Sequence, residues 1–148
     1  MDTIFEIQRI KQEVTETNKY QITHITSPMD AARLGTEIIG DEDREVLLVI
    51  VLNTKSKVVA IHRCHIGALN STVIHPREIF KSAILNNGAS LIVIHNHPSY
   101  NPSPSPQDID FTKRISKAGE LLGIELLDSI IVTNEANNYY SMNENGYL

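Results

Sequence analysis

Two short runs of apolar residues restrict the fold of this chain more than any other feature of its sequence. Residues 46–52 read VLLVIVL, and residues 91–94 read LIVI. Successive side chains of a strand point to opposite faces of a sheet, so strands of this kind are typical of a sheet that is covered on both faces. Helical patterns alternate with the predicted strands. The sequence therefore predicts an α/β or α+β domain with three layers.

Periodicity, capping residues and turn residues predict the remaining elements. Helices are expected where apolar residues recur every three or four positions, and strands where apolar or β-branched runs end at turn residues. The predicted helices are residues 4–17, 28–39, 76–86 and 106–122, and the predicted strands are residues 20–25, 45–53, 58–65, 90–95, 125–133 and 138–142. We assign residues 1–19 to a helical N-terminal extension and residues 20–148 to one domain, a length that suits a single core.

Composition limits where the protein works. The longest apolar runs are far shorter than the eighteen or so residues of a membrane span, and residues 1–6, MDTIFE, do not begin a signal peptide. Cys64 is the one cysteine, so neither an internal disulfide nor a cysteine-rich zinc knuckle is expected. These features predict a cytoplasmic protein without a membrane partner.

A cluster of histidine, serine and aspartate side chains follows the second apolar run. His95 and His97 lie two residues apart at the end of a strand, so they share one face while Asn96 points the other way. Asp108 falls in the first turn of the next predicted helix, and the long loop between them can return it to the histidines. Two histidines and one aspartate can hold a zinc ion with one position open to water, as catalytic zinc sites do.

The same residues also allow a purely structural interpretation. Ser105, Pro106 and Asp108 are good N-cap, N1 and N3 residues for a helix. A His-x-His pair at a strand end is by itself weak evidence for a metal. The two interpretations are compatible, because Ser105 can cap the helix and still present its hydroxyl to the site. We predict that His95, His97 and Asp108 bind zinc.

The spacing H-x-H-x7-S-x2-D resembles the JAMM motif of JAB/MPN metalloproteases, and the wider sequence resembles the bacterial RadC family. The resemblance covers about residues 20–142 and implies a zinc metallopeptidase-like domain with a mixed β-sheet between helices, an architecture that is similar to cytidine deaminases. Deaminase chemistry is not expected, because the chain has no P-C-x-x-C motif. The matching stretches are SP at 27–28, RE at 44–45, GALNS at 67–71, HPRE at 75–78, HNHPS at 95–99, PSPQD at 104–108, LLD at 126–128 and IIV at 130–132.

The resemblance implies roles for two further residues. Glu45 would act as the general base for a zinc-activated water, and Ser105 would donate a hydrogen bond to the oxyanion of the tetrahedral intermediate. From the residues alone, Glu45 is either a functional carboxylate at the start of an apolar strand or a solvated strand end beside other acids. Glu42 is the alternative base. The expected reaction is zinc-dependent hydrolysis of a peptide or isopeptide bond.

Two residues differ from the family pattern, and one of them is considered, together with a residue of the HPRE match, for contacts with the substrate. Tyr100 stands where the family commonly has glycine, and a tyrosine there can narrow the groove or stack on the substrate. Arg77 belongs to the HPRE match and either pairs with Glu78 or faces the substrate. We predict Arg77 and Tyr100 as substrate contacts. Ser129 replaces a histidine that usually follows Asp128 in the family.

A second function stays open at this point. The RadC family has an association with DNA repair, so the domain could instead be a non-catalytic module that binds protein or DNA. The net charge of −5 and the scattered lysines and arginines do not support general phosphate binding. Fewer than twenty residues precede the region of resemblance, so we expect either a naturally short form without the helix-hairpin-helix module of full-length RadC proteins or a truncated piece of a longer one. Neither the substrate nor the oligomeric state follows from the sequence.

Overall fold

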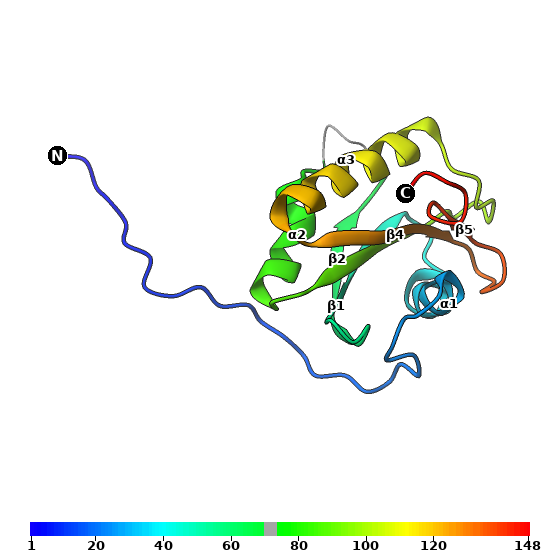
Figure 1. The fold of residues 1–148 in the computed structure, drawn as a ribbon, viewed down its shortest axis with the longest axis horizontal. Coiled ribbons are helices and arrows are strands. Elements are labelled where there is room, and N and C mark those ends of the chain that lie inside the picture. The colour runs from blue at the N-terminus through cyan, green and yellow to red at the C-terminus, as the bar shows by residue number, and fades with distance from the viewer. Residues whose placement is uncertain (70–73) are drawn as a thin grey trace.

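A five-stranded sheet between helices forms the body of the protein (Figure 1). The computed structural model describes residues 1–69 and 74–148. Within these residues the elements follow one another as α1 (Pro28–Ile39), β1 (Val46–Leu52), β2 (Val58–Ile66), α2 (Pro76–Leu85), β3 (Ser90–Asn96), α3 (Pro106–Leu122), β4 (Glu125–Val132) and β5 (Tyr140–Ser141). The predicted three-layer α/β class and the order of these elements are confirmed.

The sheet is mixed, with the strand order β2-β1-β3-β4-β5. β1 pairs antiparallel with β2 and with β3, β3 runs parallel to β4, and β4 pairs antiparallel with β5. The parallel pair fixes the polarity of the domain, since Ser90 pairs with Glu125 at one end and Asn96 with Val132 at the other. We call these the rear end and the front end of the sheet.

Two apolar cores lie on opposite faces of the sheet, as the uninterrupted apolar strands predict. Every side chain of β1 is buried. Leu48 and Ile50 pack in the core beneath α1, whereas Leu47, Val49 and Val51 pack in the core beneath α2 and α3. None of the helices formed by residues 1–69 and 74–148 has the length and apolar character that crossing a membrane requires.

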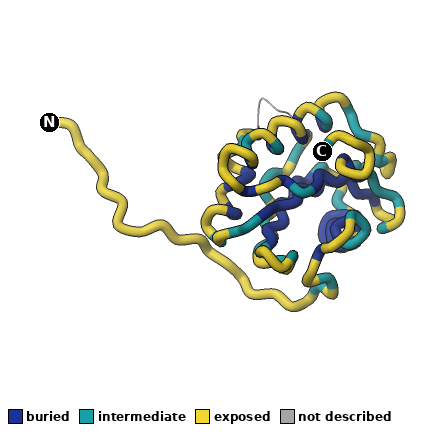
Figure 2. Tube along the Cα trace, in the orientation of Figure 1, coloured by how far each residue is buried: buried dark blue, intermediate teal, exposed yellow. Residues whose placement is uncertain are grey.

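The N-terminal extension differs from its prediction. Residues 1–19, all of them described, form no helix and run outward from the domain, so the helix predicted over residues 4–17 is wrong (Figures 1 and 2). Its apolar side chains meet no surface of the domain, and a helix of this length without packing is marginal in water. The strand predicted over residues 20–25 is also wrong, because only an isolated bridge between His24 and Lys57 forms there.

Asp128 holds the C-terminal part of the chain against the sheet. This buried carboxylate accepts hydrogen bonds from the Ser141 hydroxyl at 2.6 Å and from the backbone N–H groups of Ser129 at 2.8 Å and Asn143 at 3.1 Å. The neighbouring Ser129 hydroxyl accepts a hydrogen bond from Thr112 of α3 at 2.9 Å. Asp128 and Ser129 therefore fasten β5 and α3 to β4.

Candidate metal centre

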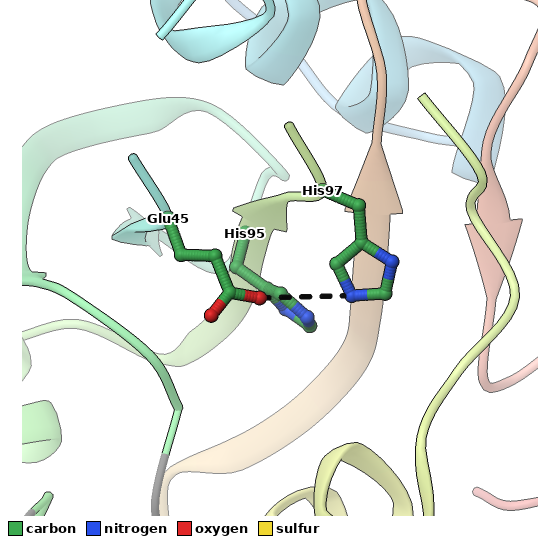
Figure 3. A group of neighbouring side chains, drawn as sticks. All are labelled: Glu45, His95 and His97. Carbon is green, nitrogen blue, oxygen red and sulfur yellow. Dashed lines mark ion pairs between the residues drawn. The ribbon is translucent and has the colours of Figure 1, made fainter. Parts of the chain in front are cut away.

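Three elements converge at the front end of the sheet and carry the predicted site residues. His95 is the next-to-last residue of β3 and His97 directly follows the strand, Ser105 caps α3 and Asp108 lies in its first turn, and Glu45 immediately precedes β1. The antiparallel register pairs Leu47 with His95, so its continuation sets Glu45 opposite His97. The side chains of Glu45, His95 and His97 point toward one another (Figure 3).

The polar atoms of these side chains lie within a few ångströms of one another. Glu45, His95 and His97 each offer a ligand atom, and these atoms all lie within 4.8 Å of one another, so the group could hold a metal ion. Asp108 contacts both imidazoles, with Oδ1 at 3.3 Å from His95 Nε2 and Oδ2 at 3.2 Å from His97 Nε2. Glu45 Oε1 lies 3.9 Å from His97 Nε2.

The protonation of His97 points to a cation in this site. Its Nδ1 lies 2.8 Å from the carbonyl oxygen of Asn101, which can only accept, so Nδ1 carries the proton. In the neutral imidazole, Nε2 then presents a lone pair to the carboxylates of Asp108 and Glu45. Lone pairs facing carboxylates repel one another unless a proton or a metal ion lies between them. The contact with Asn101 also orients the ring, as the outer partners of metal-binding histidines do.

His95 gives independent support for a metal. Its side chain is almost fully buried, and neither ring nitrogen has a hydrogen-bond partner among the residues that the structure describes. The 3.3 Å approach of Nε2 to Asp108 is short enough for an ion pair but does not have hydrogen-bond geometry. Buried polar atoms without partners are costly and uncommon. A bound metal would satisfy one of these nitrogens, so the donor set fits the ion that the sequence predicts.

The surroundings shift the pKa values of two of these groups. Burial opposes the charge of His97, but its contacts with Asp108 and Asn101 and the charge of Glu45 outweigh burial, and the pKa of His97 is raised. Burial also opposes the charge of Asp108. Its interactions with His95 and His97 and the N–H of Ser105 prevail and hold the pKa of that carboxyl well below its usual range. Asp108 is therefore an anion at neutral pH.

The two carboxylates occupy different environments. The Asp108 side chain is 4% exposed and approaches both histidines, whereas the Glu45 side chain is 25% exposed and approaches His97 alone. Zinc ligands about 2.0–2.1 Å from the ion stand about 3.3 Å apart in a tetrahedral arrangement. Asp108 meets this spacing only through two different oxygens, with Oδ1 at 3.3 Å from His95 and Oδ2 at 3.2 Å from His97, whereas Glu45 lies 3.9 Å from His97. Asp108 is thus the carboxylate nearer to the histidines, and Glu45 lies toward the solvent.

Ser105 caps α3 and also lines a cleft beside the histidines. Its hydroxyl oxygen accepts the N–H of Asp108 at 3.1 Å, and its own N–H donates to Asp108 Oδ2 at 2.8 Å, so the pair forms a capping box. A hydroxyl that accepts with its oxygen keeps its proton for another acceptor. Ser105 lines an open cleft of about 580 Å³ together with Glu45, His97 and Asp108. The helix cap and a polar contact in the cleft therefore coexist.

Asn96 fixes the segment that carries Glu45, a role that the sequence analysis missed. Its buried side chain accepts the N–H of Val46 at 2.7 Å and donates to the carbonyl oxygens of Arg44 at 2.9 Å and Glu42 at 3.3 Å. The alternation of side chains along β3 thus turns both histidines to the cleft and Asn96 to the chain before β1. An asparagine buried at a strand end, between two predicted ligands, is the signal that could have revealed this role.

We expect Asn96→Ala to destabilise the fold by about 2–3 kcal/mol, because the buried N–H of Val46 and two carbonyl groups lose their partner. Urea denaturation of the metal-free protein measures this loss. Asn101→Ala is the matched control, since Asn101 contacts His97 through its backbone carbonyl. Equal stability of the two variants would show that Asn96 does not hold this segment.

Arg77 and Tyr100 are not among the described residues that line the cleft. Arg77 is exposed at the start of α2, and Glu78 pairs with Lys81 at 3.1 Å. Tyr100 has a positive φ of 64° and accepts a hydrogen bond from Asn138 with its carbonyl oxygen. Their assignment as substrate contacts stays a prediction. Asn70 and Ser71 of the GALNS match lie outside the described residues.

The comparisons with known proteins agree with this geometry. The sequence model of the RadC-like JAB domain matches residues 25–147. A UPF0758 protein of Clostridium beijerinckii is 48% identical over 124 residues, which cover 84% of this chain and 53% of that protein. UPF0758 proteins of Clostridium kluyveri and Clostridium botulinum are 50% and 47% identical over 84% and 88% of this chain. The chain spans about half the length of these relatives.

Proposed function

We propose, from the premise that this chain belongs to the RadC-like JAB domain family, that it is a zinc-dependent hydrolase of peptide or isopeptide bonds. One observation carries the proposal: two imidazoles and two carboxylates converge at an open cleft, with His97 Nε2 directed at carboxylate oxygens. His95, His97 and Asp108 would hold the ion. A zinc ion held there would supply Lewis-acid chemistry, which makes water acidic near neutral pH and polarises a carbonyl group.

Glu45 has the position of a general base. Its carboxylate lines the cleft, is partly open to solvent and lies beside the proposed metal ligands without the short contacts to both histidines that Asp108 makes. It would accept the proton of the attacking water and deliver it to the departing amine. Positioned proton transfer of this kind is worth about 10²–10⁴-fold in rate.

Ser105 would stabilise the oxyanion that forms when water attacks the carbonyl carbon. Its oxygen is fixed by the N–H of Asp108, so the hydroxyl proton can be directed into the cleft without reorganisation of the loop. Loss of one such donor typically costs about 10²–10³ in rate. Because the oxyanion exists only after attack, Ser105 would act on the rate more than on substrate affinity.

The test combines metal content with turnover. Protein loaded with zinc is assayed against peptides and against lysine side chains acylated with short peptides, which contain the isopeptide bond. We expect hydrolysis that stops when a chelator removes the zinc and returns when zinc is restored. A protein that binds zinc and hydrolyses neither class of bond would contradict this proposal and support a binding module that retains the metal.

A further inference from the structure

The N-terminal residues present apolar side chains that nothing in the domain covers. Ile4, Phe5, Ile7, Ile10 and Val14, which we call the apolar segment, are between 68% and 92% exposed. Figure 2 shows residues 1–19 as an exposed tail beside a domain with a buried interior. Soluble proteins rarely leave several large apolar side chains together in water, and such groups commonly mark an interface.

A second cleft lies at the rear end of the sheet, away from the metal centre. This rear cleft, of about 580 Å³, is lined by Gly119, Glu120, Gly123, Glu125, Leu126 and Leu127, among others. It lies where α3 ends and β4 begins, and Leu121 and Leu122 in the same turn are 90% and 50% exposed. The pairing of Ser90 with Glu125 also brings the chain that follows α2 to this end. The rear cleft therefore has a mixed lining of leucine, glycine and acidic side chains, and exposed leucines lie beside it.

One contact connects the apolar segment with this end of the molecule. The side-chain amides of Gln12 and Asn86 exchange two hydrogen bonds, of 2.9 and 3.1 Å. Asn86 is the C-cap of α2, and Ala89, three residues later, lines the rear cleft. Gln12 therefore holds the apolar segment near the rear end, while residues 1–11 continue away from their own domain.

One basic pair of the apolar segment matches an acidic pair in the rear cleft. Arg9 and Lys11 flank Ile10, and the charged side chains that line the described part of the rear cleft are Glu120 and Glu125. Residues 1–19 carry four acidic and three basic side chains, so they lack the basic face with which amphipathic segments bind anionic membranes. An acidic cleft also disfavours nucleic acid. Protein is thus the partner that the charges favour.

We propose that the rear cleft of one copy binds the apolar segment of a second copy, with Arg9 and Lys11 facing Glu120 and Glu125. Each chain carries both the apolar segment and the rear cleft. Two copies can therefore exchange segments, so that each cleft is filled by the segment of the other copy and a symmetric dimer forms. The contact uses the end of the sheet opposite the metal centre and leaves the front cleft open to substrate.

Charge reversal tests the exchange in the full chain. One variant carries Arg9→Glu with Lys11→Glu, another Glu120→Lys with Glu125→Lys, and all four positions are exposed, so the fold is not at risk. Light scattering across a dilution series should show a wild-type dimer and, for each variant, self-association weakened about tenfold or more. An equimolar mixture of the two variants should dimerise again, because the reversed segment of one variant then meets the reversed cleft of the other, and the native segment meets the native cleft.

Glu37→Lys with Glu135→Lys is the matched control, since it changes the net charge of the chain as much as the cleft variant does, at exposed positions outside the cleft. This control should dimerise like the wild type. A monomeric wild-type protein would overturn the proposal, whether its segment is free or bound to its own cleft. Reversed variants that dimerise normally, or a mixture that stays monomeric, would overturn it as well. Zinc content is unaffected in every arm, so the result is separate from that of the hydrolase proposal.

Discussion

Asp108→Asn is expected to lower zinc occupancy from about one ion per chain to a small fraction of that value. The amide preserves the size of the side chain and an oxygen for the N–H of Ser105, so the start of α3 survives, but it removes the negative charge that faces both histidines. Loss of an outer partner alone costs about 10–100-fold in metal affinity, and loss of a ligand should exceed that. Elemental analysis after dialysis against limiting zinc measures the effect.

Asp110→Asn is the control for this experiment, because Asp110 lies two residues further along α3 and is exposed. It should keep the wild-type zinc content. Equal zinc in both variants would mean that Asp108 serves only as part of the helix cap. Glu45 would then be the carboxylate that completes the metal group with His95 and His97.

Glu45→Gln is expected to retain zinc and to lose hydrolysis by about 10²–10⁴-fold, since the amide cannot accept the proton of the attacking water. The rate constant kcat should fall while KM changes little, because proton transfer occurs in the transition state. Steady-state kinetics at saturating zinc measure both values on whichever peptide or isopeptide substrate the wild type cleaves.

Glu42→Gln separates the two acids that the sequence leaves as candidates for the base. Glu42 pairs with Arg63 at 3.4 Å and is not among the described residues of the front cleft, so its loss should change hydrolysis little. Full activity in Glu45→Gln together with lost activity in Glu42→Gln would reverse the assignment. Lost zinc in Glu45→Gln would instead make Glu45 a ligand.

The parts of the fold that were predictable are those with a local cause. The run VLLVIVL demands cover on both faces, and Ser27, Ser105 and Gly123 mark helix ends through their own backbone and side chains. The N-terminal helix and the strand at residues 20–25 had a suitable pattern as well. The N-terminal helix failed because an apolar pattern specifies a conformation only when a surface lies opposite it. At residues 20–25, Ile25 does pack in the core beneath α1, but the backbone forms only the isolated bridge between His24 and Lys57.

The sequence predicted which histidine, serine and aspartate residues gather in the site, but not every contact among the segments that form it. The spacing of His95, His97, Ser105 and Asp108 is local, and the structure brings all four together. The choice of Glu45 over Glu42 required a resemblance, because it depends on the register between β1 and β3, some fifty residues apart in the chain. The contact of Asn101 with His97 could not be predicted from its residue type, because Asn101 makes it with its backbone carbonyl.

Because His95, Asn96 and His97 point alternately to the two faces of the sheet, metal binding depends on the correct register of β3. A slip of one residue between β3 and its neighbours would leave the strand content unchanged, yet it would turn both imidazoles to the face of the sheet that α1 covers and Asn96 to the opposite face. Such a chain would match the native protein in circular dichroism while binding no zinc. Titration with the ion would therefore count correctly registered molecules in a preparation, which spectroscopy of secondary structure cannot do.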